Sequence, residues 1–350
     1  MERRFGEILE VINGKNQKKV ENPNGCYPIY GSGGIMGYAD AYICNANTVV
    51  IGRKGSINNP IFVEEPFWNV DTAFGLVAKE DILLPKYLYF FCKYFDFEQL
   101  NTTVTIPSLT KANLLKIKLE LPTLNEQRKI VAILESITEL MSMRKQQLRY
   151  CNMLVKAQFV EMFGDPVANI RGWNQELLCE VTTKIGSGAT PRGGKESYQS
   201  EGITLIRSMN VHDSYFEYKD LAHITDQQAT DLKNAIVMEN DVFINITGAS
   251  IARSCIVPKE VLPARVNQHV AIIRCVPERL NSVFANNMFI NDSFKEQLLI
   301  IGELGGATRQ AITKQQLESL VIILPPIELQ HQFATFVQQV DKSKLLLNTI

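Results

Sequence analysis

The chain has 350 residues, of which 45% are hydrophobic and 21% charged, enough to bury two ordinary cores. Its formal net charge of −1 excludes a protein that holds nucleic acid by bulk positive charge, so any contact with DNA has to come from local basic faces. Seven scattered cysteines without a Cys-x-x-Cys pair predict reduced thiols and no metal site, and the absence of a membrane-length apolar run predicts a soluble, cytoplasmic protein.

Residues 1–121 are predicted to form a mixed α and β domain. Short β-branched and aromatic runs, such as residues 48–51 and 73–78, alternate with glycine turns, a pattern typical of strands. One helix is expected over residues 85–94, because proline is favoured in the first helical turn and the aromatic residues that follow have helical spacing.

A long helix is expected over residues 125–163. Apolar residues recur at a three-four spacing over most of this segment, with charged residues between them. At 1.5 Å per residue the helix would be about 58 Å long, more than the width of a small domain. We therefore expect it to pair with another helix, the alternative being two unrelated amphipathic helices that each lie on their own domain.

The second half of the chain has the same character. Residues 165–325 predict another mixed domain, with strands at 203–206, 242–246 and 270–275 and a helix near 283–299, and residues 326–350 predict a second amphipathic helix. The two predicted pairing stripes consist of Ile130, Ile133, Ile137, Leu140 and Leu148 in the first helix and Phe333, Phe336, Val337, Val340 and Leu345 in the second.

An internal repeat connects the two halves. Displacing the chain by 203 residues against itself aligns, without a gap, Thr110-Lys111 with Thr313-Lys314, Leu121-Pro122 with Leu324-Pro325, and Gln127 with Gln330. The apolar pattern between these identities also matches. The repeat predicts two similar domains, residues 1–121 and 165–325, each followed by a helix, residues 122–164 and 326–350.

Several segments, taken in order, resemble a known family. They are the two Leu-Pro-x-Leu/Ile-x-x-Gln segments at 121–127 and 324–330, the helix end at 159–166, Gly172-Trp173, the glycine-Thr-Pro turn at 186–191, and residues 266–270. Their order and duplication are similar to the specificity subunit of type I restriction-modification systems, and the resemblance covers nearly the whole chain.

The resemblance implies an α+β fold with two tandem target recognition domains, separated by long helices that pair as an antiparallel coiled coil. Each domain would read one half of a split double-stranded DNA sequence, and the helices would fix the unread gap. The helices would also dock two DNA methyltransferase subunits, which two translocating endonuclease subunits can join. No cofactor is expected on this chain, whereas S-adenosylmethionine, ATP and Mg are expected on the partner subunits.

Catalytic motifs are incomplete in the sequence. The nearest match to the Asn/Asp-Pro-Pro-aromatic motif of adenine methyltransferases, at residues 59–62, lacks the second proline. The glycine cluster at 30–34 lacks the Gly-Lys-Ser/Thr of a phosphate-binding loop. We expect a non-catalytic DNA-reading subunit; the alternative is a coiled-coil scaffold or adaptor that binds proteins, which would show no salt-sensitive, sequence-selective DNA binding.

Loops that combine glycine with basic and short polar residues are the expected DNA contacts, because glycine lets the backbone approach phosphate while the side chains read base edges. In the first domain these are Lys15, Gln17, Lys18, Lys19, Arg53, Lys54, Ser56, Asn58, Asn101 and Thr105. In the second they are Ser187, Thr190, Arg192, Lys195, Arg207, Asn210, Thr247, Ser250, Arg253, Thr308, Arg309 and Gln310. A solvated surface charge is the alternative for each basic residue. Asp71 and Asn267 are expected to form structural hydrogen bonds.

The second helix is shorter than the first. By the same displacement Ile350 corresponds to Gln147, so an equivalent of residues 148–163, roughly 24 Å of helix, is missing. We expect either a truncated form or a shortened natural variant, whose helix pairing is incomplete and which docks a partner less firmly at that end.

Overall fold

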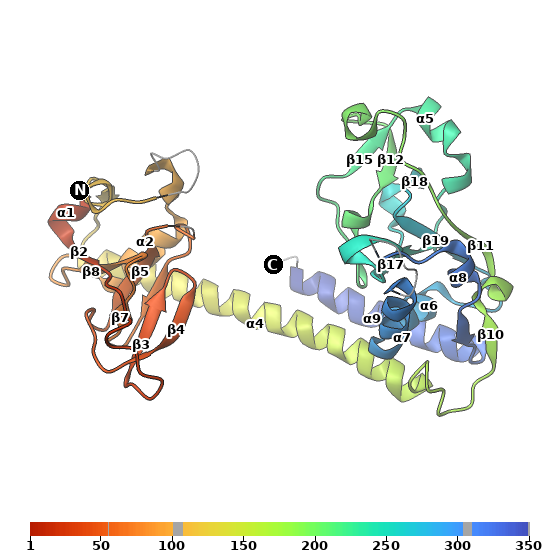
Figure 1. Ribbon diagram of the computed structural model, residues 1–350, viewed down its shortest axis with the longest axis horizontal. Coiled ribbons are helices and arrows are strands. Elements are labelled where there is room, and N and C mark those ends of the chain that lie inside the picture. The colour runs from red at the N-terminus through yellow and green to blue at the C-terminus, as the bar shows by residue number, and fades with distance from the viewer. Residues whose placement is uncertain (55, 101–107, 304–309, 349–350) are drawn as a thin grey trace. The chain divides into compact units, whose positions relative to one another are not determined.

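The computed structural model describes residues 1–54, 56–100, 108–303 and 310–348. The chain forms two compact units, Met1–Met143 and Arg144–Ile350, which we call the first and second units (Figure 1). Each unit has its own hydrophobic cores and contains both helices and strands. The predicted mixed α and β fold is confirmed.

Among the described residues, the first unit contains nine short strands, three complete α-helices and the start of a fourth. Its strands are β1 (Glu2–Arg4), β2 (Leu9–Asn13), β3 (Tyr27–Gly31), β4 (Gly34–Ala39), β5 (Thr48–Gly52), β6 (Ile61–Val63), β7 (Trp68–Asn69), β8 (Ala73–Ala78) and β9 (Lys118–Glu120) among the described residues. Its α-helices are α1 (Phe5–Ile8), α2 (Pro85–Tyr94), α3 (Lys111–Leu114) and the start of α4 (Leu124–Phe163). The predicted helix at 85–94 is confirmed.

The second unit contains the rest of α4 and the following elements. Its strands are β10 (Gln175–Leu177), β11 (Thr182–Ser187), β12 (Ile203–Ile206), β13 (Val211–His212), β14 (Tyr215–Phe216), β15 (Ala222–Ile224), β16 (Val242–Asn245), β17 (Ser254–Ile256), β18 (Ala264–Val266), β19 (Val270–Cys275) and β20 (Val321–Ile323). Its further α-helices are α5 (Asp226–Asp231), α6 (Ser282–Phe289), α7 (Asp292–Glu303), α8 (Lys314–Glu318) and α9 (Ile327–Asn348).

The two units share one sheet topology. A four-stranded antiparallel sheet has the order β2-β8-β5-β6 in the first unit and β11-β19-β16-β17 in the second. A three-stranded sheet has the order β4-β3-β7 in one and β15-β12-β18 in the other, and in both the last two strands are parallel. The pairs β1-β9 and β10-β20 also correspond. The internal repeat is therefore a repeat of architecture.

Gln127, at the start of α4, ties three backbone segments of the first unit together. Its side chain is fully buried. Its Oε1 accepts from the Leu84 amide at 2.8 Å, and its Nε2 donates to the carbonyls of Ile82 at 2.9 Å and Pro122 at 3.0 Å. The amide thus holds the start of α2 against the start of α4.

Gln330 repeats this arrangement at the start of α9. It is also fully buried, and its Oε1 accepts from the Asn281 amide at 2.9 Å. Its Nε2 donates to Arg279 O at 3.1 Å and Pro325 O at 2.8 Å. The aligned glutamines of the sequence repeat therefore fix equivalent helix pairs, α2 with α4 and α6 with α9.

Two glycines hold equivalent loops close to a strand end. A Cβ on Gly14, after β2, would lie 1.7 Å from Val70 O, and a Cβ on Gly188, after β11, would lie 1.7 Å from Val266 O. Only glycine allows this approach. The loop after the first strand of each four-stranded sheet is thereby fixed beside the connection that leads into β8 or β19.

The last turns of α4 pack on α9 within the second unit, where the two helices run in opposite directions (Figure 1). Phe159 and Phe163 of α4 contact Phe333 of α9 with ring centroids 5.5 and 5.6 Å apart. They also contact Phe284 of α6, at 5.6 and 4.8 Å. This aromatic cluster is buried, so it anchors the end of the long helix.

The predicted pairing stripes differ in their exposure. Phe333 and Val340 are buried, Phe336 and Val337 pack partly buried on the same core, and Ile130 and Leu148 are half-buried. By contrast Ile133, Ile137, Leu140 and Leu345 are exposed. Pairing of these four side chains with another helix stays a prediction.

The helix predicted near residues 283–299 is wrong in one respect, because two helices occupy this segment, α6 and α7. The chain leaves the helical path at Ile290 and Asn291, and the Asn291 side chain accepts from the Ser293 amide at 3.2 Å. Such a bond starts a new helix.

Among the described residues, no helix is long and apolar enough to cross a membrane.

Candidate nucleic-acid interface

A hollow of about 510 Å³ lies in the second unit where β16 leads into β17. It is lined by Ser208, Met209, Thr247, Gly248, Ala249, Ser250, Arg253, His269, Gln310 and Ala311. Four of these, Thr247, Ser250, Arg253 and Gln310, belong to the DNA contacts predicted from the sequence. The fold brings them together from two loops that are distant in the chain.

Local backbone geometry shapes this hollow. Gly248 has φ +74°, a left-handed conformation that favours glycine, and its amide donates to Gln310 O at 3.1 Å. Thr247 forms an isolated bridge with Ala311, so the two loops are bonded to each other. The short helix at Gly248–Ser250 then leads to Arg253.

A chain of polar side chains leads from the wall of the hollow, at Thr247 and His269, to Thr190. Thr247 Oγ1 lies 2.6 Å from His269 Nδ1, His269 Nε2 lies 3.1 Å from Gln268 Nε2, and Gln268 Oε1 accepts from Thr190 Oγ1. With the Gln268 amide donating, His269 is protonated on Nδ1 and donates to Thr247. The hydroxyl hydrogen of Thr247 is then free to donate to a ligand.

Gln268 and His269 were not among the predicted contacts. They follow the buried Asn267, whose side chain accepts from the His269 amide at 3.0 Å, as its expected structural role requires. In the sequence these two residues lie in a short polar connection between two apolar segments, β18 and β19. The fold places this connection at the same end of the sheet as the loop of Thr247. An exposed glutamine amide there presents both a donor and an acceptor.

Arg253 is a half-buried cation of this surface. Its Nη1 lies 3.4 Å from His212 Nδ1, and His212 stacks on Tyr215 with centroids 4.5 Å apart. No ion pair with a carboxylate is found for Arg253 within the described residues. Its charge is therefore available to phosphate or to the O6 and N7 acceptors of guanine.

Asn210 is a correction to the predicted contacts. It is fully buried, donates to Glu217 O at 2.9 Å and Lys219 O at 3.3 Å, and accepts from the Arg207 amide at 3.1 Å. These bonds use its side chain to hold its own loop. Arg207 likewise donates to Asp220 O and lies over a tyrosine ring, so it also fixes this loop.

The remaining predicted contacts of the second unit lie at the end of β11 and on the segment after it. Ser187, Thr190, Arg192 and Lys195 are all exposed there. Thr190 bonds to Gln268 and so joins the polar chain. Thr308 and Arg309 lie outside the described residues, as do Asn101 and Thr105 of the first domain.

In the first unit, Arg53 and Lys54 are exposed at the end of β5, the strand equivalent to β16. The Arg53 guanidinium lies over the Phe74 ring at 5.7 Å. A Cβ on Gly52 would lie 2.9 Å from Ser32 Cβ, so the β3–β4 turn lies beside this strand end. Basic side chains thus occupy the same sheet end in both units.

Lys15, Lys18 and Lys19 are exposed on the loop after β2, whereas Gln17 is half-buried. The carbonyl of Lys15 accepts from the Trp68 indole at 2.9 Å, which fixes the start of this loop. This loop is equivalent to the loop of the second unit that carries Thr190. Exposed basic side chains therefore lie at the corresponding place in the first unit.

Asn58 is exposed and uses part of its side chain within the fold. Its amide donates to Asp96 Oδ1 at 2.9 Å and its oxygen accepts from the Phe97 amide at 2.8 Å. These bonds fix the segment after α2, and one amide hydrogen and one lone pair of the oxygen are left over. Ser56 is exposed beside it.

Both halves of the chain, residues 1–150 and 171–350, match the family model of the type I restriction modification DNA specificity domain. The chain belongs to the specificity subunit family of type I restriction-modification systems. As a member it is a non-catalytic subunit with DNA-binding target recognition domains.

Relatives and solved structures agree with this assignment. The specificity subunit of Methanocaldococcus jannaschii type I enzyme MjaVIII is 22% identical, with coverage of 97% of this chain and 85% of the relative. The specificity subunit of the Escherichia coli type I enzyme EcoBI is 23% identical, with coverage of 86% of this chain and 68% of the relative. A match to the M. jannaschii specificity subunit assigned to MjaX spans 61% of that relative. A crystal structure of the S subunit from M. genitalium has a TM-score of 0.61 at 14% identity, covering 99% of this chain and 91% of that one, which shows the shared fold.

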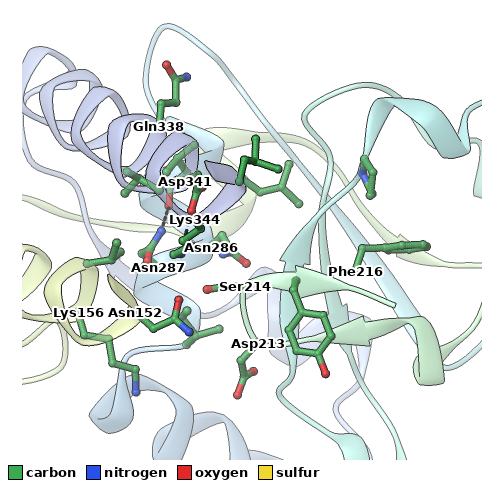
Figure 2. Close-up of a pocket in the computed structure, with 18 of the residues that line it drawn as sticks. Asn152, Lys156, Asp213, Ser214, Phe216, Asn286, Asn287, Gln338, Asp341 and Lys344 are labelled. Carbon is green, nitrogen blue, oxygen red and sulfur yellow. Dashed lines mark hydrogen bonds and ion pairs between the residues drawn. The ribbon is translucent and has the colours of Figure 1, made fainter. Parts of the chain in front are cut away.

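A larger hollow of this specificity subunit, about 820 Å³, lies between the end of α4, β14, α6 and α9 (Figure 2). Its three lysines all form ion pairs: Lys156 with Asp292 at 2.8 Å, Lys344 with Asp341 at 2.8 Å, and Lys295 with Asp213. Because each positive charge is paired, this hollow is a poorer site for phosphate than the surface of Arg253.

Four of the seven cysteines of the subunit are buried. Burial raises the pKa of the Cys44, Cys255 and Cys275 thiols to about 12, and it also raises the pKa of Cys92. These thiols stay protonated near neutral pH and fill the core.

Proposed function

We propose that this specificity subunit reads a bipartite DNA target, one half-site per unit, and presents it to docked methyltransferase and endonuclease subunits. The observation that supports this proposal is the duplication of the candidate surface. In both units the strand at the same place in the same sheet, β5 or β16, ends in a loop with exposed or half-buried basic side chains. Two such surfaces suit two half-sites.

The side chains of the second unit suggest how a half-site is read. Arg253 matches the two acceptors on the major-groove edge of guanine, and the Gln268 amide matches the acceptor and donor of adenine. The Thr247 hydroxyl adds a donor between them. In the first unit, Arg53 and Lys54 take the corresponding positions, with the lysines after β2 on phosphate.

We propose that the unread gap between half-sites is set by α4. This helix is continuous over 40 residues and has one end in each unit. Half-site spacing follows from the separation of two rigidly joined readers. S-adenosylmethionine, ATP and Mg are then needed only on the partner subunits, and we place the complex in the cytoplasm, with its DNA.

The test is to co-express the chain with a methyltransferase subunit of its own system and map methylated adenines across a plasmid library. We expect one motif of two short half-sites around a fixed gap. The Arg253→Ala variant should relax one position in one half-site, with a loss of discrimination of about tenfold to a hundredfold, since one bidentate pair contributes ~1–3 kcal/mol.

Arg149→Ala is the matched control, because Arg149 is an exposed arginine on α4, away from the loops. It should leave the motif unchanged. A continuous motif, no motif, or relaxation of both half-sites by Arg253→Ala would contradict bipartite reading.

A further inference from the structure

The wall of the hollow beside Arg253 contains apolar as well as polar side chains. The apolar ones belong to Met209, Ala249 and Ala311. Met209 is the largest of the three, and it is 44% exposed. A single exposed methionine is ordinary on a protein surface, so its surroundings decide whether it has a role.

The backbone around Met209 is held in place by two hydrogen bonds. Ser208 O accepts from the buried Asn245 Nδ2 at 2.9 Å. Met209 O lies 3.1 Å from His212 Nε2, and His212 Nδ1 lies 3.4 Å from Arg253 Nη1. Because an arginine only donates, Nδ1 of the imidazole accepts, and Nε2 carries the hydrogen that is donated to the methionine carbonyl. One histidine therefore fixes Met209 relative to Arg253.

The same hollow also offers a hydrogen-bond donor. Thr247 Oγ1 lies 2.6 Å from His269 Nδ1 and accepts from it, so its hydroxyl hydrogen is left to donate to a ligand. The major-groove edge of thymine carries one acceptor, O4, next to a C5 methyl group, and no other base of unmodified DNA carries a methyl group. A donor and an apolar side chain in the wall of one hollow therefore match the two features of the thymine edge.

The first unit also has an exposed methionine near its basic strand end. Met36 of β4 is 63% exposed, and a Cβ on Gly31 would lie 2.6 Å from its Sδ. The next residue, Ser32, lies against Gly52, which ends β5 and directly precedes Arg53. In each unit a methionine thus follows the central strand of the three-stranded sheet, β3 or β12. The second methionine argues against a chance placement in either unit.

We propose that Met209 binds the C5 methyl group of a thymine in the half-site of the second unit, while the Thr247 hydroxyl donates to O4 of the same base. Met209 and Arg253 line one hollow and share His212, so the thymine belongs to a base pair next to the one that Arg253 reads. The inference rests on the proposed function, since it needs DNA to lie on this surface.

The experiment measures binding of the assembled methyltransferase complex to fluorescein-labelled duplexes that carry the mapped motif. The half-site of the second unit is the one that Arg253→Ala relaxes. Each thymine next to the relaxed position is replaced in turn by uracil, which lacks the methyl group. One replacement should weaken binding about threefold to fivefold, the loss expected when one methyl group is taken out of an apolar contact. The Met209→Ala complex should bind the thymine and uracil duplexes equally.

Met238→Ala is the matched control, because Met238 is 51% exposed and precedes β16, at the opposite end of that strand from the hollow. It should keep the preference for thymine over uracil. Met209→Leu, which retains an apolar side chain, should keep most of this preference. Circular dichroism verifies that these substitutions at exposed positions leave the fold intact.

A further duplex separates thymine from another base with the same methyl group. In 5-methylcytosine an amino donor replaces O4. A pair of 5-methylcytosine with guanine in place of the thymine pair should therefore bind roughly tenfold more weakly, the loss typical of one wrong base pair. Binding as tight as that of the thymine duplex would overturn the assignment to thymine.

The outcomes separate this inference from the proposed function. A bipartite motif with no thymine beside the position that Arg253→Ala relaxes would overturn the inference alone. So would equal binding of the thymine and uracil duplexes by the unaltered complex, or a preference for thymine that survives Met209→Ala. A motif that Arg253→Ala leaves unchanged would overturn it too, because the hollow would then not face the bases. The absence of a bipartite motif would instead contradict the proposed function, and this inference with it.

Discussion

Gln330 shows how a single side chain can hold a helix pair. Its three hydrogen bonds join α9 to the start of α6 and to the preceding proline segment. The sequence repeat identified Gln127 and Gln330 as equivalent, but no local pattern says which backbone groups a glutamine will reach. That information is in the tertiary structure.

We predict that Gln330→Leu lowers the free energy of unfolding of the second unit by about 3 kcal/mol, since it leaves buried backbone groups unpaired. Urea unfolding measures the change through the fluorescence of Trp173, in a Trp68→Phe background. Trp173 is a suitable reporter because its indole donates to Phe163 O at 2.8 Å. The exposed Gln339→Leu should shift the free energy little. A loss below 1 kcal/mol for Gln330→Leu would contradict the structural role.

The same limit applies to the predicted DNA contacts. Asn210 has the polarity of a reading residue, yet it is fully buried and uses its amide within the fold. Gln268 and His269 lie in the candidate surface instead. Residue type cannot separate an amide that bonds its own loop from one that faces outward.

At the scale of helices and strands, the local sequence pattern predicted the bounds of several elements well. The predicted bounds of α2, β12 and β19 match the structure, and α4 begins one residue before its predicted start. The orders of the strands in the sheets could not be predicted, because β8 and β19 pair with strands distant in sequence. The periodic stripe of α4 predicted an apolar face correctly but not what covers each part of it.

The end of α4 gives an element-scale prediction. Phe159 is 2% exposed and contacts three other phenylalanines, so Phe159→Ala should destabilise the second unit by about 3–5 kcal/mol through the lost contacts and the cavity. The neighbouring Val160 is 48% exposed, and Val160→Ala should cost under about 1 kcal/mol. Urea unfolding followed at Trp173 compares them. Equal effects of the two substitutions would show that the aromatic cluster does not anchor the helix.

For the whole molecule, the separation of the cores is the main feature. Buried residues of the first unit form two clusters, and those of the second form two others that include the end of α4. The repeat in the sequence predicted this duplication, since a repeat that carries its own apolar pattern folds around its own core. Each unit can then vary its loops without disturbing the cores of the other.

Exchange of residues 1–121 for the corresponding segment of another specificity subunit tests this independence. We expect the methylation motif to change in one half-site only, with the gap and the other half-site kept, because the second unit and all of α4 stay the same. The junction needs care because the bonds of Gln127 to Leu84 and Ile82 cross it, so the incoming segment should keep these two backbone positions. Mapping of methylated adenines gives the readout, and an exchange of the segment for itself through the same cloning steps is the control. A simultaneous change in both half-sites would mean that the units do not read separately.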